Sequence, residues 1–359
     1  MRARAMEGTC LAVLVRMAIP LCRAAEDQCP RTGPGRPPDF ADWVMAVLIM
    51  TAVLKKKKSK SAQYRFLCEH KTELKNTLGL KGFPARSTYF DRYRRAHRLF
   101  QVAIRLQGEK AVSEGIVDAK TVAVDKSLIA AKGPLWHKKD RQAGRIPKGL
   151  HGVDRESTWG YSVHDGWVQG YSYEVVVTAT KPSPVFPLLA SSDTASIKEF
   201  ASFDDKIDAL PEETNDVLAD SGYDKNEFGD RIEYDPRGRS TGRHFLCTPN
   251  PRNSQSQGTK PRQGTERSAK SEMSRRQKRI AFYRSPRGRQ LYARRGQTVE
   301  PFNEWFKRTF ELDDRVWHRG IDNNRTQMLA AIFAYQILVR YNHRRGNNNG
   351  EIKWILDCL

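Results

Sequence analysis

The chain has 359 residues, enough for one large domain or two ordinary ones. Its formal net charge of +21 points to a polyanionic partner, of which nucleic acid is the commonest. A membrane-spanning protein is not expected, because the longest apolar run, Trp43 to Leu54, has 12 residues and a span needs about 20. The six cysteines form no CxxC pair, which favours reduced thiols in a cytosolic protein over zinc ligands or a disulfide framework.

Residues 1–38 are expected to form a poorly ordered leader and a linker. Two arginines precede an apolar stretch from Cys10 to Cys22, as they do in a signal peptide. Arg16 interrupts that stretch, and no small-x-small cleavage site follows it. A disordered leader, or a start codon upstream of the true one, is therefore favoured over secretion. Residues 31–38 are rich in proline and glycine and read as the linker.

Residues 39–115 are predicted to be a helical DNA-binding region. Asp42 is a plausible cap for a buried helix that ends at Leu54, and Ser61 to Leu74 reads as a second helix. A third helix, capped by Ser87, presents Arg92, Arg94, Arg95 and Arg98 between tyrosines. This order is compatible with helix-turn-helix-like docking on DNA. An ordinary basic helix facing solvent explains it equally well.

Residues 116–342 alternate strand and helix patterns, which predicts an α/β domain. The expected strands and β-rich runs are Thr121–Val124, Trp159–Trp167, Tyr171–Thr180, the run that ends at Asp220, and His244–Cys247. The expected helices are Asp193–Leu210, Asp224–Ile232, one that starts at Val299, and Thr326–Tyr341. Residues 250–290 read as a loop or disordered basic insert suited to phosphate contact, and residues 343–359 as a polar tail.

Three carboxylates lie at special places in this pattern. Asp125 and Asp220 each end a short apolar run, and Glu300 lies in the first turn of a predicted helix. The order strand, hairpin, helix, strand, helix is that of a ribonuclease H-like fold, a mixed sheet flanked by helices. The first and fourth strands of such a sheet are neighbours, so the two aspartates should meet. A single aspartate at a strand end is usually a turn or cap residue, and only the joint pattern favours a site.

Carboxylates brought together repel each other unless a cation neutralises them. Mg²⁺ suits such a site, because it prefers oxygen ligands and accepts phosphate oxygens directly. Two such ions about 3.5–4 Å apart can activate an attacking water or 3′-hydroxyl and stabilise the leaving oxygen. Glu300 would complete the ligand set, although Glu304, one helical turn further on, is an alternative.

The motifs around these acids resemble those of bacterial insertion-sequence DDE transposases. The similarity rests on Val-Ala-Val-Asp ending at Asp125, Leu-Ala-Asp-Ser-Gly-Tyr-Asp at 218–224, Val-Glu-Pro-Phe at 299–302, and the hairpin sequence Gly-Tyr-Ser-Tyr-Glu at 170–174. It covers residues 39–342. The family pattern also places a tyrosine and an arginine before the glutamate and a lysine after it. Tyr292, Arg295 and Lys307 fit that pattern, but the spacing from Arg295 to Glu300 is one residue longer than expected.

The resemblance implies a DDE transposase that uses two Mg²⁺ ions, for which Mn²⁺ can substitute, bound by Asp125, Asp220 and Glu300. Such an enzyme cleaves double-stranded DNA at terminal inverted repeats and transfers the 3′-hydroxyl into target DNA. Lys307 would contact the DNA terminus, and the other expected DNA contacts are Tyr292, Arg295 and the N-terminal arginines Arg92, Arg94 and Arg95. A homodimer on DNA is expected, by analogy, in the bacterial cytoplasm and on the nucleoid when DNA is bound. Two alternatives remain open: a decayed transposase that only binds DNA, and a metal-dependent nuclease or resolvase of the same fold.

Overall fold

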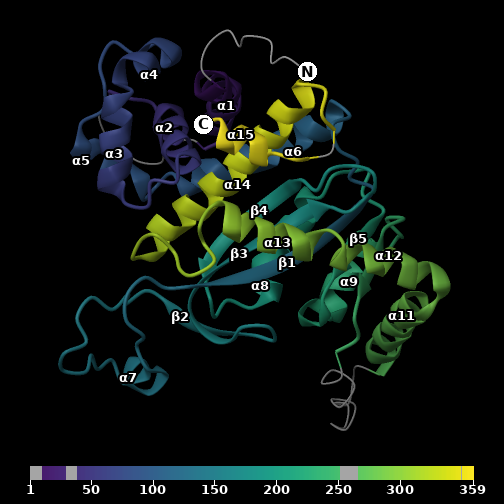
Figure 1. Ribbon diagram of the computed structural model, residues 1–359. Coiled ribbons are helices and arrows are strands. Elements are labelled where there is room, and N and C mark those ends of the chain that lie inside the picture. The colour runs from purple at the N-terminus through teal and green to yellow at the C-terminus, as the bar shows by residue number, and fades with distance from the viewer. Residues whose placement is uncertain (1–9, 30–38, 251–265, 349) are drawn as a thin grey trace.

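A computed structural model describes residues 10–29, 39–250, 266–348 and 350–359 of the chain (Figure 1). The sequence positions 30–38 of the expected linker lie outside these residues. The strands are β1 (Thr121–Ala130), β2 (Thr158–Ser162), β3 (Gly166–Thr178), β4 (Pro187–Thr194), β5 (Asp216–Ala219) and β6 (His244–Cys247). The longer helices are α1 (Cys10–Asp27), α2 (Asp42–Leu54), α6 (His97–Ser113), α11 (Glu266–Arg284), α12 (Pro286–Gly296), α13 (Val299–Thr309) and α14 (Ile321–Arg344). The shorter ones are α3 (Lys60–Glu69), α4 (Lys71–Leu78), α5 (Arg86–Tyr93), α7 (Lys138–Gln142), α8 (Glu199–Phe203), α9 (Asn226–Glu233) and α15 (Lys353–Asp357), with 3₁₀ turns η1 (Asp204–Ala209) and η2 (Ser221–Tyr223).

The six strands form one mixed sheet in the order β2-β3-β1-β5-β6, and β4 also pairs with β3. The long strands β1 and β3 are antiparallel, whereas β5 runs parallel to β1 and to β6. Val122 to Val124 and Val175 to Val177 are fully buried, as expected for central strands covered on both faces. This mixed sheet, flanked by helices and preceded by a helical region, confirms the predicted ribonuclease H-like fold. The strand that leads to Asp220 pairs with β1 as predicted, but it is the fifth strand and not the fourth, because residues 187–194 form the unexpected strand β4.

Gly170 is required where β1, β2 and β3 meet. It is the cross-strand partner of both Ala130 in β1 and Thr158 in β2. A Cβ atom built on Gly170 would lie 1.9 Å from the carbonyl oxygen of Ile129, which no side chain tolerates. Glycine at this position therefore allows β3 to continue past β1 and to carry the β2–β3 hairpin beyond the main sheet. The turn of this hairpin includes Asp165-Gly166.

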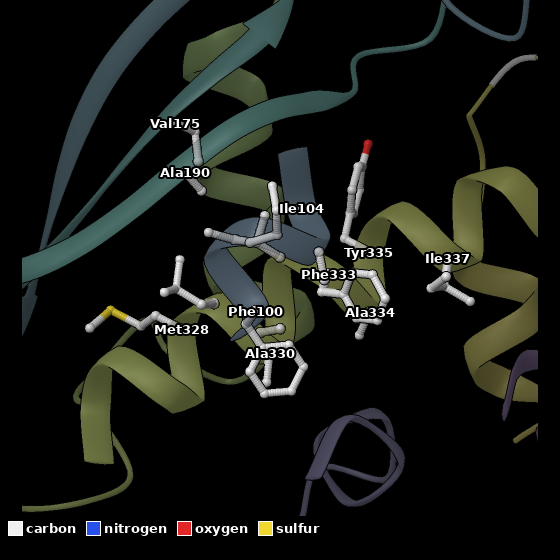
Figure 2. Close-up of a cluster of buried hydrophobic side chains, with 14 of the residues drawn as sticks. Phe100, Ile104, Val175, Ala190, Met328, Ala330, Phe333, Ala334, Tyr335 and Ile337 are labelled. Carbon is white, nitrogen blue, oxygen red and sulfur yellow. The ribbon is translucent and has the colours of Figure 1, made fainter. Parts of the chain in front are cut away.

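A layer of helices covers one face of the sheet, and α14 is its centre. Figure 2 shows Phe100 and Ile104 of α6 packed with Met328, Ala330 and Phe333 of α14, next to strands β3 and β4. Burial of each large apolar side chain contributes about 1.5–3 kcal/mol. Gln336 fixes the arrangement, because its amide donates to the carbonyls of Ile104 (2.9 Å) and Pro187 (2.7 Å). Helix α14 thereby joins the N-terminal helices to the sheet.

The expectation of a poorly ordered leader is wrong for residues 10–27. This segment forms α1, which packs against α2 and α6 and buries Leu14, Val15 and Leu21, among others. Helix α2 is apolar around its whole circumference, and eleven of its residues are buried, so it needs partners on all sides. The apolar stretch that resembled a signal peptide supplies one of them. Residues 1–9 lie outside the described part of the chain.

Residues 266–290 are also not the loop or disordered insert that their composition suggested, since they form α11 and the start of α12. The basic residues of α11 pair with acids of α9 and the adjoining loop. Arg279 donates to Asp230 (2.8 Å) and to Glu233 (3.1 Å), and Arg276 lies 2.6 Å from Asp224. The charges of Arg276 and Arg279 are thus paired with acids of the protein itself. Residues 251–265 lie outside the described chain.

Smaller corrections concern helix ends and the C-terminus. The predicted second helix is divided at His70 into α3 and α4, and the helix expected over 193–210 is shorter because residues 187–194 form β4. The expected caps Asp42 and Ser87 instead lie inside the first turns of α2 and α5. The tail is not uniformly polar, because α15 follows Ile352 and buries Ile355. In the described part of the chain, no helix is both long and apolar enough to cross a bilayer.

His318 links α5 to the segment before α14 and makes stability depend on pH. Its Nε2 lies 3.1 Å from the hydroxyl of Tyr93, and its side chain is buried. Burial, together with the positive charges of Lys60 and Lys132, lowers the pKa of His318 from 6.5 to about 3. Below pH 6.5 the imidazole of His318 therefore binds a proton in the unfolded chain but stays neutral in the folded one. Between pH 6.5 and pH 4 this difference should remove about 3 kcal/mol of stability.

We expect His318→Gln to remove this contribution, so its free energy of unfolding should fall less steeply with acid than that of the wild type. Urea titrations at a series of pH values from 7 to 4 would measure the difference between the two slopes. Parallel curves for the two proteins would show that the buried imidazole is not the group that titrates.

Candidate active site

The sheet brings Asp125 and Asp220 to the same level on neighbouring strands. The parallel register pairs Ala123 with Leu218, so two residues further along each chain Asp125 stands beside Asp220. Asp220 lies immediately after the last residue of β5, and Asp125 lies within the longer β1. The expectation that both acids end their strands therefore holds for Asp220 and is wrong for Asp125, because β1 continues to Ala130. The last pair in the β1–β5 register, Ala123 with Leu218, lies two residues before each acid.

A tight turn after β5 holds the Asp220 side chain. Its carboxylate accepts a hydrogen bond from the backbone N–H of Gly222 at 2.8 Å and caps η2. A Cβ on Gly222 would lie 3.0 Å from Oδ1 of Asp220 and 3.3 Å from the carboxyl carbon of Glu199. Glycine therefore permits the close approach of this turn to its own carboxylate.

A buried network of polar side chains joins this turn to strand β3. The hydroxyl of Tyr223 donates to Glu174 of β3 at 2.6 Å, and the other oxygen of Glu174 accepts from Lys206 at 2.9 Å. Glu174 and Lys206 are 1% and 4% exposed, so each charge depends on the other. Burial raises the pKa of Glu174, while Lys206 and Tyr223 oppose that shift. No sequence pattern pairs Glu174 with Lys206, because η1 and β3 meet only in the folded protein.

The fold strongly perturbs the pKa of Asp125. Burial raises its pKa to about 7, with Arg295 opposing the shift and the negative charges of Asp220 and Glu300 adding to it. We refer to the three predicted carboxylates, Asp125, Asp220 and Glu300, as the acid cluster. Perturbed carboxylates of this kind concentrate at functional sites.

Arg295 lies inside this cluster, between two of the acids. Its guanidinium donates to Oδ1 of Asp125 at 2.6 Å and to Oε1 of Glu300 at 2.7 Å. The side chain is buried, whereas that of Glu300 is 57% exposed at the first turn of α13. Within the described chain, Nε of Arg295 is buried without a hydrogen-bond partner. Arg295 was expected to be a DNA contact, but in this structure its direct partners are the two carboxylates.

Asn303 is a member of the site that the sequence reading missed. Its amide nitrogen donates to Oδ2 of Asp125 at 2.7 Å, and its amide oxygen accepts from the hydroxyl of Tyr173 at 3.0 Å. It stands three residues after Glu300 on α13, so the two side chains lie on the same side of that helix. Helical spacing from the glutamate is the signal that could have identified it. Together, Arg295 and Asn303 fix both oxygens of Asp125.

We expect Asn303→Ala to weaken metal-dependent activity about 10- to 100-fold, as loss of a partner that orients a ligand usually does. Tyr173→Phe removes only the hydroxyl behind the amide, and should have a smaller effect of the same sign. The half-saturating Mg²⁺ concentration for DNA cleavage would measure both. An unchanged Mg²⁺ dependence in Asn303→Ala would show that this amide does not orient Asp125 for function.

Lys307 and Tyr292 lie at the border of the acid cluster. Burial lowers the pKa of Lys307, although the carboxylates of Asp165, Asp313 and Asp125 oppose this shift. The hydroxyl of Tyr292 lies 2.6 Å from that of Thr248. Burial also raises the pKa of Tyr292, and the charge of Asp220 contributes to that shift.

The N-terminal arginines lie elsewhere, on and after α5. Arg92 turns inward, pairs with Asp42 and donates to the carbonyl of Phe40, so the expectation that it faces solvent is wrong. Arg94 and Arg95 are 58% and 74% exposed and share Asp91 as a partner, at 3.0 and 3.4 Å. The buried rings of Tyr89 and Tyr93 pack α5 into the helical layer. Only Arg94 and Arg95 of the three predicted contacts remain on the surface.

The donor set of the acid cluster fits a divalent cation, provided that Arg295 moves. No three carboxylate, histidine or cysteine side chains converge as a ready-made metal cluster in the part of the chain that the structure describes. Arg295 lies where positive charge is needed between Asp125 and Glu300, and its buried Nε lacks a partner there among the described residues. Three carboxylates supply only oxygen ligands, which Mg²⁺ prefers. The residues that would hold it are Asp125, Asp220 and Glu300.

Residues 113–337 match the family model of the transposase DDE domain. The match spans more than half of the chain and includes all three acids of the cluster, Arg295, Asn303 and Lys307. The chain therefore belongs to the family of transposases with a DDE domain. No curated protein and no solved structure was found to match it.

Proposed function

We propose that this chain is a DNA transposase that cleaves double-stranded DNA at terminal inverted repeats and joins the freed 3′-hydroxyl to target DNA. The observation that carries the proposal is the acid cluster, in which the register of β1 and β5 sets Asp125 beside Asp220 and Glu300 influences the same carboxyl group. Membership of the transposase family supports the same chemistry.

In this proposal Asp125, Asp220 and Glu300 hold two Mg²⁺ ions, and Mn²⁺ can substitute. The bound ions would supply charge stabilisation for the phosphoryl transfer and lower the pKa of the attacking hydroxyl. Asn303 keeps the Asp125 carboxylate in one orientation, and the Gly222 turn does the same for Asp220. Arg295 leaves the two carboxylates when the cations bind. No side chain of the protein has to act as a nucleophile.

The residues proposed to contact DNA at this site are Lys307, Tyr292 and the displaced Arg295. Arg94 and Arg95 would add contacts from the N-terminal helices. The formal charge of +21 favours binding to a polyanion. We further propose a homodimer that holds two element ends, working in the bacterial cytoplasm and associated with the nucleoid while bound to DNA.

A strand-transfer assay separates this function from that of a nuclease or resolvase. DNA ends that are already cleaved and carry a 3′-hydroxyl would be mixed with the protein, Mg²⁺ and a supercoiled target plasmid. A transposase should yield plasmid covalently joined to the labelled ends. Cleavage of intact ends without any joined product would assign the site to hydrolysis alone and contradict the proposed function.

A further inference from the structure

The exposed large hydrophobic side chains of the described residues all fall in one segment, between positions 135 and 167. They are Leu135 (62% exposed), Ile146 (37%), Tyr161 (59%), Val163 (95%) and Trp167 (59%). Single exposed hydrophobic residues scattered over a surface need no explanation, but a concentration of them marks an interaction site. We name the surface formed by Tyr161, Trp167 and Lys138 the Trp167 platform.

The Trp167 platform joins aromatic rings to positive charge. Tyr161 and Trp167 are cross-strand partners whose rings meet edge to face, with centroids 5.4 Å apart. Lys138 places its ammonium 4.5 Å from the centroid of the Trp167 ring. The neighbouring loop is basic, with exposed Lys132, Lys139, Arg145, Lys148 and Arg155. An aromatic surface surrounded by cations fits a polyanion that carries flat rings, which is a nucleic acid strand.

Buried hydrogen bonds hold the platform rigid. The backbone N–H of Trp136 donates to the side-chain oxygen of Gln169 (2.6 Å), and the indole N–H of Trp159 donates to the carbonyl of Trp136 (2.9 Å). The amide nitrogen of Gln169, which is 2% exposed, donates to Ser157 (2.8 Å). The loop that carries Lys138 is thereby fixed to the hairpin. A preformed surface loses little conformational entropy on binding.

The platform and the acid cluster share one face of the sheet. Val175 is the cross-strand partner of Asp125, and Trp167 precedes Val175 by an even number of residues on β3, so all three point to the same side. The separation along the strand is about 26 Å, the length of about eight base pairs. One DNA strand of that length could therefore contact both.

We propose that the Trp167 platform binds an unpaired stretch of a DNA strand, with bases stacked on Trp167 and Tyr161 and phosphates neutralised by Lys138 and its basic neighbours. Every base has a stackable face, so such binding tolerates any sequence. A second copy of this chain is a poorer occupant, because two surfaces of the same positive sign would repel each other. The location beside the cleavage site rests on the proposed function, whereas the binding itself does not.

The test is fluorescence anisotropy of the full chain with two labelled oligonucleotides of equal length, one of thymidines and one of abasic residues. Trp167→Ala should weaken binding of the thymidine strand by about 5- to 100-fold and leave the abasic strand unchanged, because only stacking is lost. Trp167→Phe should retain most of the affinity, which also controls for folding. Lys138→Ala should weaken both strands alike, because it removes a phosphate contact.

Equal binding of the thymidine strand by Trp167→Ala and wild type would overturn the proposal. So would a loss of self-association in sedimentation velocity without a loss of DNA binding, which would assign the surface to a second copy of the chain. The assay needs no cleavage, so its outcome is separable from the proposed function. If the chain is an active transposase and Trp167→Ala binds the thymidine strand as well as the wild type does, only the platform proposal fails. If the chain is inactive and Trp167→Ala no longer binds the thymidine strand, the platform proposal stands and the proposed function fails.

Discussion

Glu300→Gln should abolish Mg²⁺-dependent DNA cleavage, whereas Glu304→Gln, the same substitution one helical turn further along α13, should leave it within a factor of two. The negative charge of Glu300 adds to that of the other acids around Asp125, and its Oε1 accepts a hydrogen bond from Arg295 at 2.7 Å. Glu304 is 72% exposed and pairs with Arg308 on the outer surface of the helix. The expected loss for Glu300→Gln is on the order of 10³-fold, equivalent to about 4 kcal/mol of transition-state stabilisation.

The two glutamines make a matched pair, because each replaces a largely exposed carboxylate on the same helix. Surface substitutions of this kind change stability by about 0.5 kcal/mol or less, so neither variant should unfold. Rates of cleavage under single-turnover conditions, with DNA binding measured in parallel, would separate chemistry from affinity. Equal rates for the two variants would remove Glu300 from the site, and a loss confined to Glu304→Gln would move the third ligand by one helical turn.

Arg295→Gln should destabilise the metal-free protein by about 3–5 kcal/mol, the usual cost of removing one partner of a buried ion pair. The variant leaves Asp125 buried among other carboxylates without its cation. The loss should shrink as the pH falls through about 7, since Asp125 then becomes protonated and needs no partner. A cation in the cluster should also compensate for the missing guanidinium.

Arg295 and a divalent cation compete for the same carboxylates, so the variant should gain more stability from Mn²⁺ or Mg²⁺ than the wild type does. Urea titrations with and without the metal would measure both effects. Arg294→Gln is the control, because Arg294 is the adjacent arginine on α12 and donates to the hydroxyl of Thr121 at 3.3 Å. An equal cost for both arginines, or equal stabilisation by metal in wild type and Arg295→Gln, would contradict the competition.

The pairing of the two central strands could be predicted from the order of strand and helix patterns, which is that of a ribonuclease H-like fold. Each aspartate follows a short apolar run, although β1 continues past Asp125 to Ala130. Val299, Phe302 and Phe306 likewise define the buried side of α13, which leaves Glu300 at its rim. Patterns of two and of three to four residues carry this information within a single element, without knowledge of the rest of the fold.

Arg295 and Asn303 could not be assigned in the same way. Their contacts with Asp125 join positions 170 and 178 residues apart, and nothing in either helix specifies them. Arg295 was matched to DNA through the family pattern, which describes residue order but does not identify the partner in the metal-free protein. Buried polar contacts of this kind depend on three elements packing together, so they appear only in the structure.

Composition led to a wrong prediction for two segments, and for the same reason in both. Residues 10–27 looked like a leader because they are apolar, and residues 266–290 looked disordered because they are basic. In the fold, α1 covers the uniformly apolar α2, and the arginines of α11 find acids on α9. Whether an apolar or charged helix is stable depends on its neighbours, which composition does not report.

The most direct test of the account is cleavage of a DNA fragment that carries the repeats flanking this reading frame, with wild type beside Asp220→Asn in the same Mg²⁺ buffer. The acid cluster predicts cuts at the repeat ends by the wild type, and none by a variant that still binds those ends. Equal cutting by both proteins would place the chemistry elsewhere. Equal binding with no cutting by either would contradict catalysis and leave a transposase that only binds DNA.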